Sequence, residues 1–341
     1  MRWLMVGHAK QRRLSNLMTR PAILCILLNF RTPAMTLRAA EAALADLHAL
    51  GGELVIVDNA SGDGSYEMLA EQVAARGWGE GGLVRVVPSP VNGGFGAGNN
   101  IGLKMQLSDG RAPDYYYILN SDAFPDAGAT AALLGHLETH PQAGIACSHI
   151  RGEDNVVHTT AFRFPSIAGE FVGAARLGFI ERLLPEAPVP MPQPEITMQV
   201  DWSAGASMML RRTMLEQIGT FDETFFLYFE ETDLCLRAAR AGWSCWYVPD
   251  SRVVHIGSVS TGMKTKRRMP SYWYDSRRHY FIKNHGRPYA AAALFAHLLG
   301  GVLHRLRVGL VGRRPQDPNW FLRDLAAHAI TPYRLSPEDR S

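Results

Sequence analysis

Residues 23–30 read ILCILLNF, an apolar run that is typical of a β-strand buried on both faces of a sheet. Thr32 and Pro33 follow, a good N-cap and a good first helical residue. Together they predict an Ala- and Leu-rich helix that ends at the Gly51–Gly52 pair. The chain therefore opens with a strand that leads directly into a helix.

The same alternation continues along the first half of the chain. Strands that alternate with helices predict an α/β fold whose Rossmann-like sheet is mostly parallel, is flanked by helices and has right-handed crossovers. The further strands are predicted at 54–57, 83–87, 115–119 and 144–150, and the further helices at 66–75 and 130–139.

The second half of the chain is less regular. Residues 162–199 accumulate prolines, which predicts an irregular surface loop with short helices. Order returns with VDWSAGASMMLRR at 200–212 and a short helix near Met214. A helix is then predicted over 230–241 with Gly242 at its C-cap, followed by short strands at 246–248 and 253–256.

The composition excludes several classes of protein. The chain has 341 residues and a mass of 37.7 kDa, which suits one large domain with an appendage. Hydrophobic residues make up 47% and charged residues 20%, so a packed core is expected and global disorder is not. A net charge of +3 is too small to predict a nucleic-acid partner.

Cysteine usage and apolar stretches bear on the compartment. The four cysteines form no C-x-x-C pair, and Cys25 and Cys147 lie in strand-like runs where cysteine is usually a small buried hydrophobe. A reducing cytoplasm fits best. Residues 1–20 lack the apolar stretch of a secretory signal, and residues 290–303 are shorter than the roughly 20 that a spanning helix needs. We therefore expect no segment to cross a membrane.

Polar residues stand where the predicted strands end. Asn29, the pair Asp58–Asn59 and the segment Asn120-Ser121-Asp122 each follow an apolar run. In open α/β sheets, ligands bind at the carboxyl ends of the strands. These positions therefore predict a ligand site.

Asp122 has the chemistry of a metal ligand. A diphosphate leaving group needs a divalent cation, and hard oxygen ligands suit Mg²⁺ or Mn²⁺. The alternative is an ordinary strand-to-helix turn, which the segment favours when it is taken alone. His255, at another strand end, could supply an imidazole to the same metal, although a single histidine there is more often structural.

Two further segments have the residue types of a nucleotide site. Asp58, in VDNASGDGS, could accept hydrogen bonds from a ribose or a base. The segment VNGGFGAGNN at 91–100 has glycines that permit close approach of the backbone to a ligand, but it is a weak dinucleotide fingerprint because it does not follow the first strand. Structural glycines are the alternative.

Three carboxylates open the helix predicted at residue 230. Asp233 is explained by the helix dipole and by an i,i+4 pair with Arg237. Glu230 and Glu231 directly follow the aromatic run at 225–229. A carboxylate beside aromatic walls loses solvation, so its pKa rises toward the range of a general base.

The order and wording of these motifs resemble glycosyltransferase family 2, especially its rhamnosyltransferase-like branch. The matching stretches lie within residues 23–257: ILLNF, VDNASGDGS, NGGFGAGNN, YILNSD, VDWSAGASMMLRR, FDETFFLYFEETDLCLRAARAGW and VVHIGS. The resemblance implies the GT-A fold over 21–257, with a nucleotide-binding half at 21–125 and an acceptor-binding half at 126–257. Residues 1–20 are then an N-terminal extension and 258–341 a basic, amphipathic C-terminal extension.

The resemblance also implies roles for single residues. Asp122 is the metal ligand of a DXD-type motif whose first acid is here an amide, so metal binding depends on Asp122 and His255. Glu231 stands at the position of the catalytic base, which is often an aspartate in the family, and Glu230 is a minor competitor. The remaining expected contacts are Asn29, Asp58, Asn59, Asn92, Gly98 and Asn120 with the nucleotide, and Trp202 and Gly205 with the sugar and acceptor.

The implied activity is inverting sugar transfer from a nucleotide diphosphate donor to a hydroxyl of a glycan or polyprenyl-linked glycan, in cell-surface polysaccharide synthesis. Rhamnose from its dTDP donor is the first expectation, and a UDP-sugar is the other. Two other classes of function remain. A sugar nucleotidyltransferase would normally carry a basic phosphate-gripping loop after the first strand, where NFRTPAMT offers only Arg31. A non-catalytic sugar-binding module would not need Asp122, Glu231 and His255 together.

The C-terminal third is basic. Between Gly257 and Ala290, eight basic residues are opposed by Asp275 alone, and five tyrosine and tryptophan residues are interleaved with them. Such a segment beside a short apolar helix suits peripheral attachment to the anionic inner face of the plasma membrane. The same charges could instead hold the donor diphosphate or an anionic lipid-linked acceptor, or form a solvated face. The basic residues are Lys264, Lys266, Arg267, Arg268, Arg277, Arg278, Lys283 and Arg287.

Overall fold

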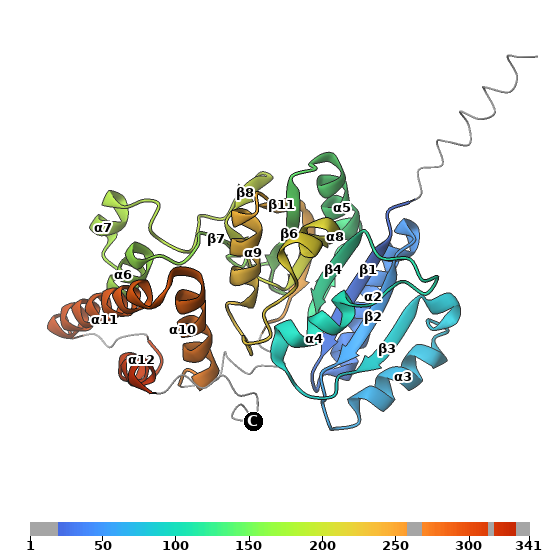
Figure 1. Cartoon of the computed structure of the whole chain (residues 1–341), viewed down its shortest axis with the longest axis horizontal. Helices are drawn as coiled ribbons and strands as arrows, with labels where there is room; N and C mark the ends of the chain where they lie inside the picture. Colours follow the sequence, from blue (N-terminus) through green and yellow to red (C-terminus); the bar gives the residue numbers. More distant parts are fainter. Residues whose placement is uncertain (1–19, 258–267, 313–316, 332–341) are drawn as a thin grey trace, which may run out of the picture.

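The computed structural model describes residues 20–257, 268–312 and 317–331. It consists of a twisted sheet covered by helices, with a separate group of helices at one end (Figure 1). The N-terminal extension, residues 1–19, lies outside the described residues, and so do Lys264, Lys266 and Arg267. The predicted α/β class, with helices flanking the sheet and a helical C-terminal region, is confirmed.

The larger sheet has 9 strands in the order β3-β2-β1-β4-β10-β6-β11-β5, with β8 paired to β11. β3, β2, β1 and β4 are parallel, and β11 runs parallel to β6. β10 is antiparallel to both of its neighbours, β4 and β6. The strands are β1 (Ile23–Asn29), β2 (Glu53–Asp58), β3 (Val84–Pro88), β4 (Tyr115–Asn120), β5 (Ala123–Pro125), β6 (Ala143–Arg151), β8 (Met198–Val200), β10 (Ser207–Arg211) and β11 (Ser244–His255).

Helices cover both faces of this sheet. A smaller sheet pairs β7 (Ala161–Phe162) with β9 (Trp202–Ser203). The helices of the sheet layer are α2 (Pro33–Leu50), α3 (Ser65–Ala75), the short 3-10 helix η1 (Glu80–Gly82), α4 (Gly94–Leu103), α5 (Ala129–Thr139), α8 (Arg212–Ile218) and α9 (Glu230–Arg240). The group at the end of the molecule contains α6 (Ile167–Ala175), α7 (Gly178–Leu183), α10 (Ser271–His285), α11 (Arg287–Leu310) and α12 (Phe321–Ile330).

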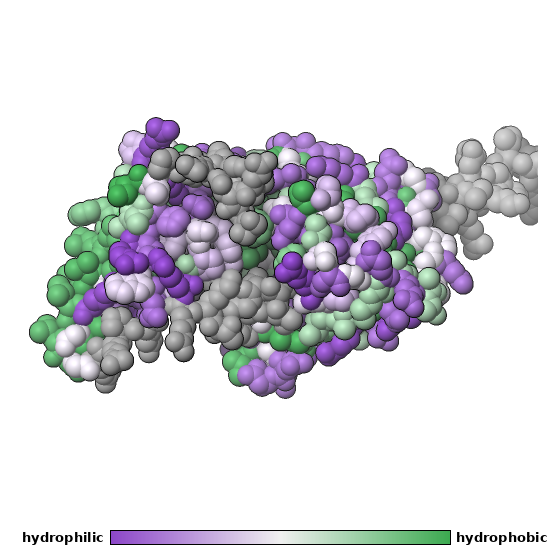
Figure 2. Space-filling model, turned by 90° about the horizontal axis from the view of Figure 1, so that it is seen from below, coloured by the Kyte–Doolittle hydropathy of each residue, from purple (hydrophilic) through white to green (hydrophobic). Residues whose placement is uncertain are grey.

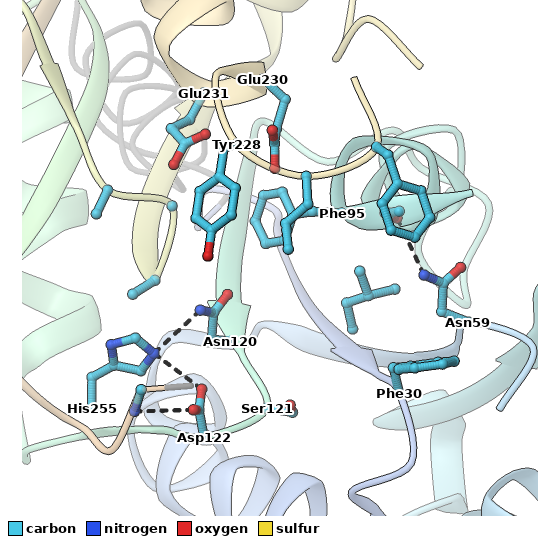
Figure 3. A pocket seen from close by; sticks show the side chains of 18 of the residues that line it. Phe30, Asn59, Phe95, Asn120, Ser121, Asp122, Tyr228, Glu230, Glu231 and His255 are labelled. Atoms are coloured by element: carbon cyan, nitrogen blue, oxygen red, sulfur yellow. Dashed lines mark hydrogen bonds and ion pairs between the residues drawn. The ribbon is translucent and has the colours of Figure 1, made fainter. Parts of the chain in front are cut away.

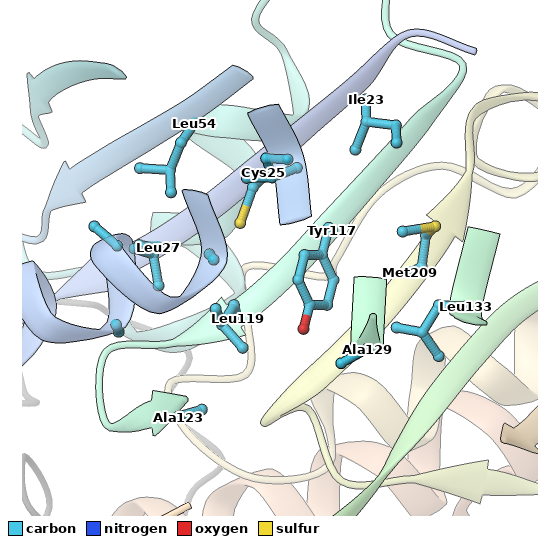
Figure 4. Close-up of a cluster of buried hydrophobic side chains, with 14 of the residues drawn as sticks. Ile23, Cys25, Leu27, Leu54, Tyr117, Leu119, Ala123, Ala129, Leu133 and Met209 are labelled. Carbon is cyan, nitrogen blue, oxygen red and sulfur yellow. The ribbon is translucent and has the colours of Figure 1, made fainter. Parts of the chain in front are cut away.

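The apolar run that opens the chain lies at the centre of the core. Ile23, Cys25 and Leu27 face one side of β1 and pack with the cluster under α2 and α5 (Figure 4). Leu24 and Ile26 face the other side and belong to a second cluster. All five side chains are fully buried, as expected for a strand with helices on both faces. All four cysteines are buried and unpaired, and burial was predicted for Cys25 and Cys147.

The glycine-rich segment at 92–102 is largely a helix and not a loop that wraps a ligand. An ideal Cβ at Gly98 would lie 2.4 Å from Leu28 Cδ1, and one at Gly102 would lie 2.7 Å from Ile26 Cγ1. These glycines therefore let α4 lie directly on β1. The structural reading of the glycines is the correct one for Gly98.

Three local predictions need correction. Thr32 stands at the N-cap of α2, but its side chain makes no capping bond, because its hydroxyl donates to Asn29 Oδ1 instead. The two strands predicted at 246–248 and 253–256 are one strand, β11, with a register shift between Val248 and Arg252. The apolar helix predicted near 290–303 extends from Arg287 to Leu310.

α11 is longer than predicted because its polar residues bind neighbouring segments of the same chain and do not interrupt the helix. His297 Nδ1 lies 2.6 Å from Glu170 Oε2 of α6, and Arg307 donates to the carbonyl of Arg176. Gly300 allows α6 to approach closely, since a Cβ there would lie 2.6 Å from the Phe171 oxygen. By length and composition alone, α11 is the one helix in the described residues that could cross a membrane.

Four of the basic residues of the C-terminal third that the structure describes are bound to other parts of the protein. Arg277 pairs with Glu170, and Arg268 pairs with Asp324. Lys283 lies 2.8 Å from both Asp222 and Asp233. Arg278 donates to two carbonyls at the end of α12. These four residues therefore tie the C-terminal helices to other segments, with Arg277 buried and Arg268 exposed at the surface.

Candidate active site

A cavity of about 540 Å³ opens at the carboxyl ends of the central strands. Residues at the ends of β1, β2 and β4 line it on one side, and the start of α9 lines it on the other. Tyr272 of α10 completes the wall. A cavity therefore lies at the strand ends where the sequence predicted a ligand site, and part of its lining comes from the C-terminal helices.

Asp122 and His255 meet at one end of this cavity (Figure 3). Asp122 follows β4, and His255 ends β11, which pairs with β5 immediately after Asp122. His255 Nε2 lies 3.0 Å from Asp122 Oδ1 and 3.3 Å from Asn120 Nδ2. The Gly257 amide donates to Asp122 Oδ2 at 3.1 Å. Burial acts to raise the pKa of Asp122, but the hydrogen bonds from His255 and Gly257 outweigh it and lower that pKa.

Two of the groups beside the cavity could hold a divalent cation. In the described residues no three His, Cys, Asp or Glu side chains converge as a metal cluster. Asp122 and His255 supply one carboxylate and one imidazole. Mg²⁺ sites that also bind substrate phosphates commonly use one or two protein carboxylates, with phosphate oxygens and water as the other ligands. This donor set therefore fits a cation that is bound together with a diphosphate.

Glu230 and Glu231 lie at the opposite side of the cavity, at the first two positions of α9. Glu230 is 2% exposed, and the Oε2 atoms of both residues are buried without a hydrogen-bond partner. Burial raises the pKa of both carboxyl groups, and for Glu230 the neighbouring charge of Glu231 raises it further. Both carboxyl groups have therefore lost solvation, as the aromatic run before them predicted.

Asp233 has the structural role that the sequence indicated. Its carboxylate lies 2.8 Å from Arg237 Nε and also accepts from Lys283 and Asn284. It points away from the cavity, toward α10. Of the three carboxylates at the start of α9, Glu230 and Glu231 line the cavity, and Asp233 binds α10.

Asp58 and Asn29 form a buried polar network below the cavity. Asn29 Nδ2 donates to Asp58 Oδ1 at 2.7 Å, and Asn29 Oδ1 accepts from Thr36. Ser61 donates to both Asp58 oxygens, through its hydroxyl and its amide. Asn29 is fully buried and Asp58 is 4% exposed, and neither lines the cavity. In this geometry Asn29 orients Asp58.

Asn59 and Asn92 stand at the cavity wall, and Gly98 does not. Asn59 Nδ2 donates to Asn92 Oδ1 at 2.9 Å and to the Gly94 carbonyl at 3.2 Å. Its Oδ1 atom is buried without a partner. Gly94 must be glycine here, because its φ is +89° and a Cβ would lie 1.8 Å from the Phe226 carbonyl oxygen. Gly98 packs on Leu28 outside the cavity, so the expected contact between Gly98 and a nucleotide has no support in the structure.

Of the two residues expected near the sugar, Gly205 lines the cavity and Trp202 does not. Gly205 lines the cavity, where a Cβ would lie 3.1 Å from the Phe95 ring and 3.9 Å from Glu231 Oε1. Trp202 lies outside the cavity lining: its ring stacks on Phe162 at 4.3 Å, and its indole N–H donates to the Arg163 carbonyl. Trp202 therefore fixes the small sheet and does not line the site.

Most of the large side chains in the cavity lining that were not predicted from the sequence are aromatic. Their positions follow from tertiary packing, and the only local signal was the aromatic run at 225–229, which was noted for its effect on Glu230 and Glu231. The further cavity residues are Phe30, Phe95, His158, Phe226, Tyr228 and Tyr272.

Comparisons with known proteins identify the family and the fold. A family model described as glycosyl transferase family 2 matches residues 27–219. The N-acetylglucosaminyl-diphospho-decaprenol L-rhamnosyltransferase of Mycobacterium tuberculosis (strain H37Rv) is 30% identical over 221 residues, which are 61% of this chain and 68% of that protein. The rhamnosyltransferase WbbL of Escherichia coli (strain K12) is 28% identical over 164 residues, which are 48% of this chain and 60% of that protein.

Solved structures share the fold. GalNAc-T7 with UDP, GalNAc and Mn²⁺ aligns with a TM-score of 0.55 at 14% identity, over 93% of this chain and 56% of that one. The chain thus spans just over half the length of that structure. The mannosyltransferase PcManGT of Pyrobaculum calidifontis, in complex with GDP-Man and Mn²⁺, aligns with a TM-score of 0.53 at 15% identity, over 96% of this chain and 88% of that one.

Proposed function

The chain belongs to glycosyl transferase family 2 and is a glycosyltransferase, and we propose from that premise that it inverts the anomeric centre of the sugar it transfers. The observation that carries the proposal is the arrangement of the cavity. A buried carboxylate pair, Glu230 and Glu231, lies on one side of it, and the Asp122–His255 pair lies on the other. A base on one side of the cavity and a diphosphate site on the other suit direct displacement of the diphosphate by the acceptor hydroxyl, which inverts the anomeric centre.

In the proposed reaction Glu231 removes the proton from the acceptor hydroxyl. That oxygen attacks the anomeric carbon, the bond to the diphosphate breaks, and the nucleoside diphosphate leaves with the electron pair. The unpartnered Oε2 atom of Glu231 is free to accept the proton, and its raised pKa helps it to hold that proton. Glu230 shares the raised pKa and is the competing base.

Asp122 and His255 would hold the divalent cation, Mg²⁺ or Mn²⁺, with Asn120 beside them. When bound, the cation neutralises the negative charge that develops on the departing diphosphate. The Asn59 Oδ1 atom, buried and without a partner, is available to the nucleotide, and Asn92 holds the Asn59 amide in place. Asp58 lies behind Asn59, outside the cavity lining, and hydrogen bonds from Asn29 and Ser61 hold its carboxylate in place.

The similarity to two rhamnosyltransferases supports a dTDP-rhamnose donor, with a UDP-sugar as the other candidate. The first of these relatives is named for an N-acetylglucosaminyl-diphospho-decaprenol substrate, which supports a polyprenyl-linked glycan as the acceptor here. A role in cell-surface polysaccharide synthesis follows from that acceptor.

A lipid-linked acceptor would require the enzyme to work at the cytoplasmic face of a membrane. We propose that α11 makes the peripheral contact with lipid. One face of this helix exposes large apolar side chains, and Figure 2 shows apolar residues gathered at this end of the molecule. The exposed residues recur with the spacing of one helix face: Phe295, Leu299, Val302, Leu303, Leu306 and Leu310.

A panel of UDP, dTDP, GDP and their common sugar conjugates tests the proposed function, measured as shifts in melting temperature with and without Mn²⁺. A ligand that binds only the folded protein raises its stability by mass action. A metal-dependent shift confined to one nucleotide supports the proposal and identifies the donor class. Release of the nucleoside diphosphate on adding acceptor supports transfer, whereas release of pyrophosphate favours a nucleotidyltransferase. No shift with any nucleotide contradicts the proposal.

A further inference from the structure

The wall of the cavity next to the carboxylate pair is aromatic. The rings of Tyr228 and Tyr272 are nearly parallel, with centroids 6.3 Å apart and an interplanar angle of 23°. The Phe226 ring lies 5.5 Å from Tyr272. Both tyrosines line the cavity, and Tyr228 projects into it beside Glu231 in Figure 3.

The backbone is strained where this wall is built. Tyr228 and Phe229 have φ values of +73° and +70°, so two consecutive aromatic residues adopt the left-handed conformation. Such positions cost about 1–3 kcal/mol each and persist where the surrounding structure enforces them, often at ligand sites. Here the turn brings Tyr228 into the cavity and starts α9, so that Glu230 and Glu231 follow directly.

Tyr272 is held at the wall by the contacts of α10. The Ser276 hydroxyl donates to the Leu227 carbonyl at 3.0 Å, which ties α10 to the strained turn. His279 Nε2 lies 2.9 Å from Asp222, and Lys283 bridges Asp222 and Asp233. The basic residues of α10 thus have a positioning role, because they fix the helix that carries Tyr272.

We propose that Tyr228 and Tyr272 form a platform for the ring of the acceptor sugar. This inference rests on the proposed function and adds the part of the site that selects the acceptor. A pyranose has an apolar face of C–H groups, which loses contact with water when it lies flat on an aromatic ring and meets the negative face of that ring. A sugar on this wall has its hydroxyls next to Glu231, where the attacking group must lose its proton.

The platform and the expected nucleotide contacts come from different segments of the chain that line the same cavity. Asn59 and Asn92 follow β2 and β3, whereas the tyrosines come from the turn before α9 and from α10. α10 lies beyond residues 27–219, which the family model matches. Acceptor choice is thereby assigned to the turn before α9 together with α10, and donor binding to the ends of the sheet strands.

Saturation-transfer NMR tests the platform with methyl glycosides of N-acetylglucosamine, rhamnose, mannose and galactose, in the presence of Mg²⁺ and UDP or dTDP. The variants are Tyr272→Ala and Tyr272→Phe, and Phe295→Ala is the control, since it truncates an exposed aromatic ring on α11. One sugar should receive saturation mainly on the C–H protons of one ring face. Tyr272→Ala should weaken its binding about tenfold, the size of a good aromatic contact. Tyr272→Phe should bind within about twofold of the wild type.

The platform is refuted if no glycoside binds the wild type, if Tyr272→Ala binds sugar as the wild type does, or if Tyr272→Phe loses as much as Tyr272→Ala. It is also refuted if Tyr272→Ala weakens UDP- or dTDP-sugar binding and spares the glycoside, because the wall then serves the donor. Nucleotide binding is measured separately on the same samples. A wild type that binds glycosides but no nucleotide contradicts the proposed function and leaves the platform standing.

Discussion

His255 Nε2 lies 3.0 Å from Asp122 Oδ1, and the pairing of two strands brings the residues together. β11 runs antiparallel to β5, with His255 opposite Ala123, the residue that follows Asp122. The contact is therefore fixed by the sheet and not by a flexible loop. It defines the end of the cavity where the diphosphate and its cation would lie.

Asp122→Asn should remove the metal-dependent part of the nucleotide thermal shift, because an amide is a poor ligand for a hard cation compared with a carboxylate. His255→Gln should reduce that part by a smaller amount. Asp126→Asn is the matched control: this carboxylate follows β5 closely and pairs with Arg151 instead. An unchanged metal response in Asp122→Asn would assign the cation to other residues.

Glu231→Gln should lower transfer by about 10²–10⁴-fold, the usual contribution of a general base, and leave donor binding close to that of the wild type. Glu230→Gln should cost less, because Glu230 is the competing and not the assigned base. Initial rates and nucleotide thermal shifts measure the two properties. A larger loss of rate in Glu230→Gln would exchange the two roles.

The rate should fall as pH falls through the raised pKa of Glu231, because only the ionised carboxylate accepts the acceptor proton. The acid limb of kcat/KM should therefore lie above the ordinary carboxyl value of 4.5. A pH–rate profile measured with saturating Mn²⁺ at each pH checks this. An acid limb at or below 4.5 would argue against a buried base.

Burial of Glu230 should make the protein less stable as pH rises. A carboxyl whose pKa is higher in the folded than in the unfolded state stabilises the fold below its unfolded pKa, and this contribution is lost as pH rises through the folded pKa. Glu230→Gln removes the ionisation, so the variant should gain melting temperature relative to the wild type as pH rises above about 4.5. Melting curves recorded between about pH 4 and 8, a range that includes the ordinary pKa values of glutamate and histidine, test the sign of this change in stability.

Gly98→Ala should destabilise the protein by about 1–3 kcal/mol, because the new methyl group would overlap Leu28. Gly135→Ala, in the interior of α5 with no atom within 4 Å of its ideal Cβ, should instead stabilise by about 0.5–1 kcal/mol. Denaturant unfolding compares the pair. A Gly98→Ala protein of normal stability that fails to bind nucleotide would restore Gly98 to the ligand site.

Leu299→Ser combined with Leu306→Ser should abolish flotation with liposomes, because both side chains lie on the exposed face of α11. Binding of the wild type should persist at about 0.5 M salt, since the described basic residues are mostly paired internally and hydrophobic contact is not screened. Val156→Ser, an exposed apolar residue in the loop after β6, is the control. Flotation that depends on anionic lipid and is lost in salt would favour charge attraction instead.

Local pattern was enough to predict β1 to β4, β6 and helices α2, α3, α5 and α9, and the strand ends at which the cavity lies, but not α4, β5 or β8. Hydrophobic periodicity, helix caps and glycines at the ends of elements each depend on only a few consecutive residues, so they can be recognised in the sequence alone. The division of the acid cluster was also partly readable, because Asp233 and Arg237 are one helical turn apart.

Tertiary packing alone decided the remaining features. Gly98 and an active-site glycine look the same in sequence, and only the approach of α4 to β1 separates them. Trp202 faces Phe162, and the basic residues of α10 meet carboxylates on distant segments, because side-chain partners depend on how the layers assemble. Tyr272 reaches the cavity for the same reason: its helix is fixed by contacts with α9 and the turn before it, which no local rule in the sequence describes.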